Sequence, residues 1–214
     1  MNIKVVSRIL EANDRLAEDN RKIFRDSNVY VINLMSAPGA GKTTLLERTV
    51  SGLSGKKKIG VIEGDIATDS DAQRIAALGV PVVQINTGGA CHLDANMIRE
   101  ALSGLPLKDM ELLFIENVGN LVCPAEFDIG ENEKVMILSV TEGDDKPLKY
   151  PLMFERASAL VINKIDLLPF VDASVQKIRE DSLRLNPGMR IFEASAKTGS
   201  GLQPWFEWLN QKGK

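Results

Sequence analysis

The sequence is poor in soft metal-binding residues, with one histidine and two cysteines among 214 residues. Because no secretory signal precedes them, two cysteines exclude a disulfide framework and indicate a reducing compartment, which we expect to be the cytoplasm. No apolar run approaches the roughly 20 residues of a membrane-spanning helix. A formal net charge of −3 provides no basic surface for nucleic acid or anionic lipid. We therefore expect no nucleic-acid partner and no membrane partner.

The composition, 44% hydrophobic and 26% charged, is that of a globular protein with one core. Residues 3–26 read as an amphipathic helix that precedes the first strand. Its apolar positions are Val6, Ile9, Leu16 and Ile23. We predict that residues 1–28 form a helix packed on the domain and that residues 29–214 form a nucleotide-binding domain.

Apolar runs then alternate with helical patterns along the rest of the chain. The predicted strands are Val29–Met35, Lys58–Ile62, Val80–Ile85, Leu112–Ile115, Lys134–Val140, Ala159–Ile162 and Arg190–Glu193. The predicted helices are Thr43–Leu53, Asp69–Leu78, His92–Leu102, Lys146–Arg156, Asp172–Leu185 and Leu202–Asn210. This alternation predicts an α/β fold with three layers and a mainly parallel seven-stranded sheet, in which ligands bind at the carboxyl ends of the strands.

A glycine-rich run, Ser36–Thr44, lies between the first strand and the first helix of this domain. A strand, a glycine-rich loop and a helix in this order form a phosphate-binding loop, the P-loop of NTPases. Lys42 is expected to reach the β- and γ-phosphates, and the Thr43 hydroxyl to bind Mg²⁺. Ser36 stands where the usual pattern has glycine. The residues expected to contact the nucleotide here are Pro38, Gly39, Ala40, Gly41, Lys42, Thr43 and Thr44.

The nucleotide base is predicted to be guanine. Asn163, Lys164 and Asp166 follow a predicted strand, and a carboxylate there can accept hydrogen bonds from both N1–H and N2–H₂ of guanine, a donor pair that adenine lacks. Asn and Asp are also common turn residues, so the position at a strand end carries the prediction. A second base-contacting segment is expected after the last strand, at Ser195, Ala196 and Lys197.

Acidic residues at two further strand ends are candidates for Mg²⁺ and catalysis. Glu116 and Gly119 match an acid-x-x-Gly element, whose glycine N–H meets the γ-phosphate. The alternative is a strand-terminal acid and a turn glycine. In the acidic loop 63–71, Asp65 is our first choice, whereas Thr68 or Asp69 are equally suited to cap a helix. We expect Thr43, Asp65 and Glu116 to hold Mg²⁺, and Lys42, Asp65 and Glu116 to be catalytic.

The chain's two cysteines and its histidine form a second candidate site. Cys91 and His92 follow one strand, and Cys123 lies four residues after Gly119. A lone cysteine is more often a buried apolar residue, but thiolate and imidazole also bind Zn²⁺, Ni²⁺ or copper. Three ligands do not complete a tetrahedral structural site, and a two-fold dimer could pool two sets.

Together these motifs resemble one family, the hydrogenase nickel-incorporation GTPases (HypB). The most specific segments are GACHLDA and ENVGNLVCP, and the resemblance covers nearly the whole chain after Val29. It implies a slow GTPase, a homodimer favoured by GTP, and a nickel or zinc site at the dimer interface on Cys91, His92 and Cys123. It also implies two partners, a second nickel-binding maturation factor and the hydrogenase large-subunit precursor. No cysteine-rich amino-terminal motif and no histidine tract is present, so a metal-storage role is not expected.

Three other functions fit parts of the sequence. The first is a GTP-dependent metallochaperone for another enzyme, such as urease or a cobalamin enzyme. The second is a small-molecule kinase, against which Asn163 and Asp166 argue, because most such kinases bind adenine. The third is a regulatory switch that carries no metal.

Overall fold

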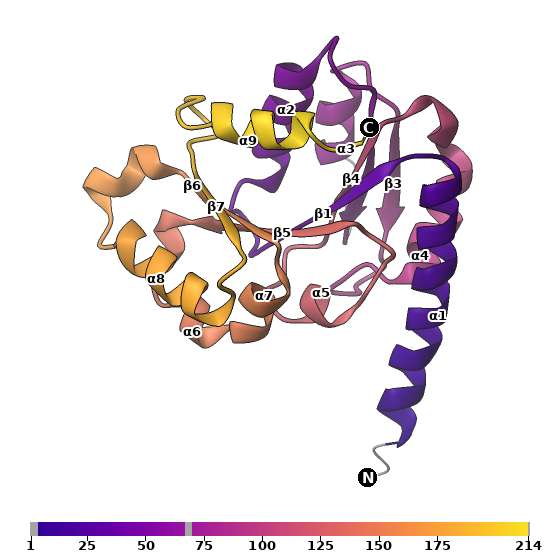
Figure 1. The fold of residues 1–214 in the computed structure, drawn as a ribbon, viewed down its shortest axis with the longest axis horizontal. Helices are drawn as coiled ribbons and strands as arrows, with labels where there is room; N and C mark the ends of the chain where they lie inside the picture. Colours follow the sequence, from indigo (N-terminus) through magenta and orange to yellow (C-terminus); the bar gives the residue numbers. More distant parts are fainter. Residues whose placement is uncertain (1–3, 67–69, 214) are drawn as a thin grey trace.

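The computed structural model describes residues 4–66 and 70–213, with side chains from residue 10 onward. Within these residues, seven strands form one sheet in the order β3-β2-β4-β1-β5-β6-β7 (Figure 1). Every neighbouring pair runs parallel. The strands are β1 (Tyr30–Ser36), β2 (Ile59–Asp65), β3 (Val82–Asn86), β4 (Leu112–Glu116), β5 (Glu133–Ser139), β6 (Ala159–Asn163) and β7 (Arg190–Glu193). The predicted three-layer α/β fold is confirmed.

Helices cover both faces of the sheet. The α-helices are α1 (Lys4–Asp26), α2 (Lys42–Leu53), α3 (Ser70–Ala76), α4 (Ala95–Ala101), α5 (Cys123–Glu126), α6 (Lys146–Lys149), α7 (Pro151–Arg156), α8 (Val175–Leu185) and α9 (Gln203–Asn210). Short 3₁₀ helices are η1 (Leu102–Gly104), η2 (Leu107–Asp109), η3 (Val140–Glu142) and η4 (Ile165–Phe170). Helices α2 and α9 lie on one face, and α5, α7 and α8 on the other (Figure 1). None of the described helices is long and apolar enough to cross a bilayer.

Three predicted helices differ from the structure. Helix α8 begins at Val175 rather than at Asp172, because the Ser174 side chain accepts from the Lys177 N–H and caps it. The helix expected over Lys146–Arg156 is divided into α6 and α7, because Pro151 lacks the N–H that a continuous helix needs. Helix α4 begins at Ala95 rather than at His92, since the Asp94 side chain accepts a hydrogen bond from the Met97 N–H and caps the helix there. The residues before Asp94 are therefore loop, which leaves Cys91 and His92 outside helical geometry. The proposed cap at Thr68 or Asp69 lies outside the described residues.

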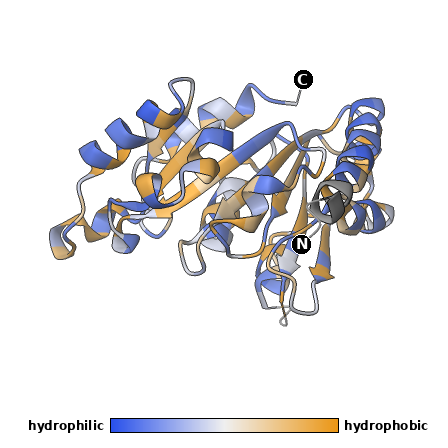
Figure 2. Ribbon diagram, turned by 90° about the horizontal axis from the view of Figure 1, so that it is seen from below, coloured by the Kyte–Doolittle hydropathy of each residue, from blue (hydrophilic) through white to orange (hydrophobic). Residues whose placement is uncertain are grey.

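The core consists of apolar residues from the strands, packed under the helices (Figure 2). Strands β4 and β6 are buried along their whole length, as expected for parallel strands covered on both faces. On the α2 and α9 face, Trp205 is fully buried and its indole N–H donates to Thr49 Oγ1 at 2.9 Å. This contact holds the middle of α2 against α9 on one face of the sheet.

The buried face of α1 includes polar residues that the apolar pattern did not predict. Leu16 and Ile23 are only partly buried, and the side chains of Val6 and Ile9 lie outside those described. From residue 10 of α1 onward, the residues that are at least 94% buried are Asn13, Ala17, Asn20 and Phe24. Ile23 packs against the core as the pattern suggests, whereas Asn13 and Asn20 were missed because their amides bond to backbone groups of the domain. The helix packs beside α4 (Figure 1), and the division at residue 28 stays a prediction.

Candidate functional site

The glycine-rich loop joins β1 to α2 at the carboxyl edge of the sheet. Gly39 and Gly41 have φ values of 73° and 98°, which only glycine adopts without strain. Lys42 donates from Nζ to Ser36 Oγ at 3.0 Å, and Ser36 in turn donates to the Ala37 carbonyl. Ser36 is fully buried. The serine in the usual glycine place therefore holds the lysine inside the loop, where its charge faces an incoming phosphate.

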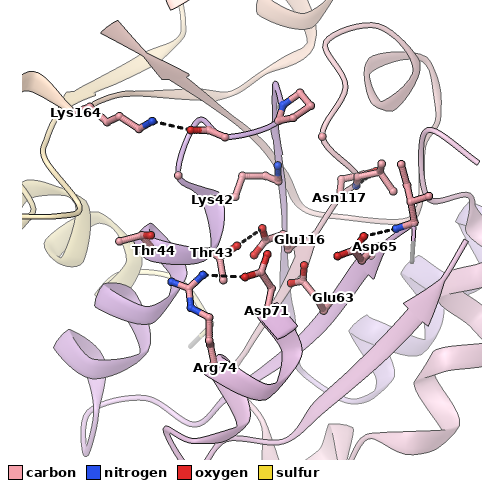
Figure 3. A pocket seen from close by; sticks show the side chains of 17 residues that line it. Lys42, Thr43, Thr44, Glu63, Asp65, Asp71, Arg74, Glu116, Asn117 and Lys164 are labelled. Carbon is pink, nitrogen blue, oxygen red and sulfur yellow. Dashed lines mark hydrogen bonds and ion pairs between the residues drawn. The ribbon is translucent and has the colours of Figure 1, made fainter. Parts of the chain in front are cut away.

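This loop forms one wall of a cavity of about 500 Å³. The other walls come from the ends of β2 and β4 and from α3 (Figure 3). Glu63, Asp71 and Glu116 project into it, each with one oxygen within 4.8 Å of the others. Thr43 donates from Oγ1 to Glu116 Oε1 at 2.9 Å. The side chains predicted from the loop and from β4 therefore meet in one place.

The two glutamates of this cavity have unmet hydrogen-bonding capacity. Glu63 and Glu116 are each 3% exposed, and in the described part of the chain neither Oε2 atom has a partner. Burial, and then the charge of Glu116, raise the pKa of Glu63 to about 10. Burial also raises the pKa of Glu116, although Lys42 opposes that shift. Buried carboxylate oxygens without partners fit a hard cation such as Mg²⁺.

The structure brings Glu63 and Asp71, rather than Asp65, into this cluster. Asp65 lines the same cavity, and its carboxylate accepts the N–H of Ile66. The sequence prediction placed the end of β2 at Ile62, whereas the strand continues to Asp65 and pairs Glu63 with Glu116 in register. The sequence did contain a signal for this pair. Glu63 lies one residue beyond the predicted end of its strand, and Glu116 lies one residue beyond the predicted end of the adjacent strand.

Asn117 connects this cavity to the cysteine-containing loop. Its Oδ1 accepts from the N–H of Leu93 at 3.0 Å, and its Nδ2 donates to Asn33 Oδ1 at 3.2 Å. Asn117 is 1% exposed. Leu93 directly follows His92, so the residue after Glu116 links the end of β4 to the loop that carries Cys91. The sequence prediction gave Asn117 no role.

Gly119 packs directly on the glycine-rich loop. A Cβ atom at this position would lie 2.9 Å from both Cα and N of Pro38. We expect Gly119→Ala to displace one of the two segments at a cost of about 1–3 kcal/mol. Calorimetric titration with a non-hydrolysable nucleoside triphosphate should show correspondingly weaker binding.

The control for this variant is Gly188→Ala. A Cβ atom there would meet only Asn186 Oδ1, at 3.6 Å, which is an ordinary contact. Unchanged triphosphate affinity in Gly119→Ala would contradict the steric argument.

A smaller cavity of about 240 Å³ lies beside the phosphate loop, at the end of β6. Asp166 lines it, and its Oδ1 atom is buried without a hydrogen-bond partner among the described residues. Thr44 lines the same cavity. An unpartnered carboxylate oxygen is what a donor-bearing purine edge requires.

Asn163, Lys164, Ala196 and Lys197, also predicted to bind the base, line the same cavity and make further contacts within the protein. Asn163 donates to the Ala40 carbonyl at 2.9 Å and accepts from the Ala196 N–H at 3.0 Å, so it ties the phosphate loop to the loop after β7. Lys164 donates from Nζ to the Gly39 carbonyl at 2.7 Å. Ser195 is fully buried and its Oγ accepts from the Thr198 N–H.

Arg48 is a positioning residue that the sequence prediction missed. It donates from Nε to the Ala196 carbonyl and from Nη2 to the Lys197 carbonyl, each at 2.9 Å. Lys197 itself is exposed. Nothing in the local sequence around Arg48 indicates this contact, because its partners lie about 150 positions away.

The two cysteines and the histidine meet as predicted. Cys91 Sγ lies 3.1 Å from Cys123 Sγ and 3.7 Å from His92 Nδ1. The His92 ring packs on Phe127 with a centroid distance of 3.9 Å. Burial lowers the pKa of His92, which favours the neutral imidazole that binds metals. The hydrogen bond between Cys91 and Cys123 raises the pKa of the Cys123 thiol. Two thiols and a neutral imidazole are a donor set for Ni²⁺ or Zn²⁺.

Comparison with known proteins agrees with these motifs. A family model described as CobW/HypB/UreG, nucleotide-binding domain, matches residues 30–193. The chain belongs to the HypB group of this family. It is 51% identical to hydrogenase maturation factor HypB of Azotobacter vinelandii over 98% of the chain and 69% of that protein. It is 53% identical to HypB of Escherichia coli K12 over 94% of the chain and 69% of that protein.

A solved HypB structure has the same fold. HypB from Helicobacter pylori in complex with nickel superposes with a TM-score of 0.89 at 41% identity, covering 92% of this chain and 93% of that one. The matched family model describes a nucleotide-binding domain. The cavity beside the glycine-rich loop therefore lies within a nucleotide-binding domain.

Proposed function

We propose that this protein is a GTP-hydrolysing metallochaperone that assists insertion of nickel into the [NiFe]-hydrogenase precursor. One observation supports the proposal: the segment 116–123 contacts the glycine-rich loop through Gly119 and the other cysteine through Cys123. Gly119 packs on the glycine-rich loop, Cys123 contacts Cys91, and Asn117 bonds to the residue after His92. The names of the HypB relatives and the nickel complex support the same conclusion.

In this proposal GTP occupies the two adjacent cavities. Asp166 accepts the guanine N–H groups, and Lys42 compensates the charge of the terminal phosphates. Thr43 and Glu116 would hold Mg²⁺, with Glu63 and Asp71 beside them in place of the predicted Asp65. When bound, Mg²⁺ would neutralise charge that develops on the phosphate oxygens during hydrolysis.

The cargo metal, Ni²⁺ or Zn²⁺, would bind to Cys91, His92 and Cys123. Three ligands leave a coordination position open, which suits delivery rather than permanent storage. A homodimer favoured by GTP would bring two such clusters together across a two-fold axis. A second nickel-binding maturation factor would exchange nickel with this site, and the hydrogenase large-subunit precursor would receive it.

The nucleotide and the metal are expected to change each other's affinity. A γ-phosphate that contacts Gly119 would reposition Cys123 relative to Cys91. Such couplings are typically about 1–3 kcal/mol and are reciprocal. The test is to titrate Ni²⁺ into the GDP form and the GTP-analogue form, with size-exclusion chromatography and metal quantification. Equal affinity and equal stoichiometry in both forms would overturn the coupling.

We expect Cys123→Ala to weaken Ni²⁺ binding and to leave nucleotide affinity nearly unchanged. The thiol supplies one of three soft ligands, whereas no nucleotide-cavity residue contacts it among the described contacts. Competition with a chromophoric chelator measures the metal affinity, and calorimetry measures the GTP-analogue affinity. Loss of nucleotide binding in this variant would show that Cys123 is a structural residue.

A further inference from the structure

Two buried asparagines of α1 bond to the backbone on both sides of the thiol–imidazole cluster. Asn13, 6% exposed, accepts from the Ala95 N–H at 2.9 Å and donates to the Asp128 carbonyl at 2.8 Å. Asn20, fully buried, donates to the Ala95 carbonyl at 2.8 Å and to the Ile129 carbonyl at 3.3 Å. Each side chain therefore joins the start of α4 to the turn after α5.

The joined segments are those that carry the metal ligands. Ala95 lies three residues after His92 and begins α4. Asp128 follows Phe127, whose ring packs on His92, and α5 before it begins with Cys123. The two segments leave β3 and β4, which are not neighbours, because β2 lies between them in the sheet. Sheet pairing alone therefore does not set the distance between the two ligand-bearing segments.

Further contacts hold α1 against the same turn. Arg21 donates from Nη2 to both carboxylate oxygens of Asp128, at 2.9 and 2.7 Å. Gly130 has a φ of 93°, and a Cβ atom there would lie 2.7 Å from the Ala17 carbonyl oxygen. The helix backbone and the turn are thus in direct contact, with an ion pair at the rim.

We propose that Asn13 and Asn20 are positioning residues for the metal cluster: they hold the Cys91–His92 loop and the Cys123 segment at the separation that brings the three ligands together. The inference rests on the proposed metal site and deepens it. Burying an amide has a cost unless all its groups are bonded, and Asn20 Oδ1 has no partner among the described residues, so an apolar residue would be buried more favourably there. The amides instead fix two backbone segments at defined distances. Residues that orient metal ligands in this way typically change metal affinity by about 10–100-fold.

The experiment compares Asn13→Ala and Asn20→Ala with the unmodified chain. Ni²⁺ affinity is measured by chelator competition, the thiolate-to-nickel absorption band reports ligation, and GTP-analogue affinity reports the fold. We expect Ni²⁺ affinity to fall about 10-fold or more in each variant, with nucleotide affinity nearly unchanged. If either variant fails to fold, Arg21→Leu, which loses the ion pairs with Asp128 and Glu18 but keeps both asparagine amides, should shift Ni²⁺ affinity in the same direction by less.

Two controls separate positioning from general loss of stability. Asn186→Ala removes comparable bonds to the Glu155 and Ala157 carbonyls, far from the cluster in sequence. Phe24→Leu loosens α1 packing without removing an amide bond. We expect neither to change Ni²⁺ affinity. An equal loss in these controls, or unchanged Ni²⁺ affinity in both folded asparagine variants, would overturn the proposal.

Combination with Cys123→Ala distinguishes this inference from the metal site itself. When Cys123 is absent, the distance between the two segments no longer matters, so Asn20→Ala should have no further effect on the residual affinity. A full additional loss would indicate a structural role. If Cys123→Ala binds Ni²⁺ as tightly as the unmodified chain, the proposed metal site fails, whatever the asparagine variants do.

Discussion

Replacing Asp166 by asparagine is expected to lower the affinity for GTP by about 10²–10⁴-fold. Asp166 Oδ1 is buried and unpartnered in the described structure, so it is available for the two donors of guanine. Two hydrogen bonds to a charged group contribute about 1.5–3 kcal/mol each, and 1.4 kcal/mol corresponds to a tenfold change in affinity. In the variant, the asparagine N–H₂ group can face the guanine N2–H₂ group, so that two donors meet and neither has an acceptor.

The same variant should bind xanthosine triphosphate better than the unmodified chain does. Xanthine carries a carbonyl at C2 where guanine has an amino group, and the asparagine amide can donate to it. Competition calorimetry with both triphosphates measures this exchange of preference. The control is Asp172→Asn, which removes the same charge from an exposed position. An equal loss for both triphosphates would mean that Asp166 supports the fold rather than reads the base.

Local sequence predicted the elements and motifs whose chemistry is local. The seven strands were found, since buried parallel strands are continuous apolar runs between turns. The phosphate loop was found, because Gly39, Gly41 and Lys42 carry their geometry and charge in consecutive positions. The meeting of Cys91, His92 and Cys123 also followed, because parallel strands place their carboxyl ends at one edge of the sheet.

Contacts between distant segments could not be predicted in the same way. The buried face of α1 is set by Asn13 and Asn20, whose partners lie 75 to 115 positions away. Arg48 and Asn163 likewise act on loops that approach only in the folded chain. Asp65 was preferred to Glu63 because the predicted strand ended at Ile62, three residues before the observed end, so the register that pairs Glu63 with Glu116 was not seen.

The cavity acids lead to the second large expected effect, that of Glu63→Gln. Glu63 has a pKa of about 10 in the folded protein, against 4.5 as its ordinary value, first because of burial and then because of Glu116. The folded state therefore holds a proton that the unfolded state releases. The contribution of protonated Glu63 to the free energy of unfolding is fully present below about pH 4.5 and is lost as pH rises toward 10. Glutamine resembles the protonated acid and does not titrate.

Glu63→Gln should thus unfold at a higher temperature than the unmodified chain at pH 8 when Mg²⁺ and nucleotide are absent, and the difference should shrink toward pH 5. A carboxylate is nevertheless what a hard cation requires, so the variant should bind Mg²⁺ more weakly and hydrolyse GTP at least about 10²-fold more slowly. Thermal unfolding across pH and single-turnover hydrolysis provide the two measurements. Asp109→Asn, at a partly exposed acid of η2 outside the cavity, is the control. A variant that is less stable at pH 8 yet hydrolyses GTP normally would show that Glu63 is structural. Greater stability together with lost hydrolysis is the expected result, because the buried carboxylate would then serve to bind Mg²⁺ when nucleotide is present.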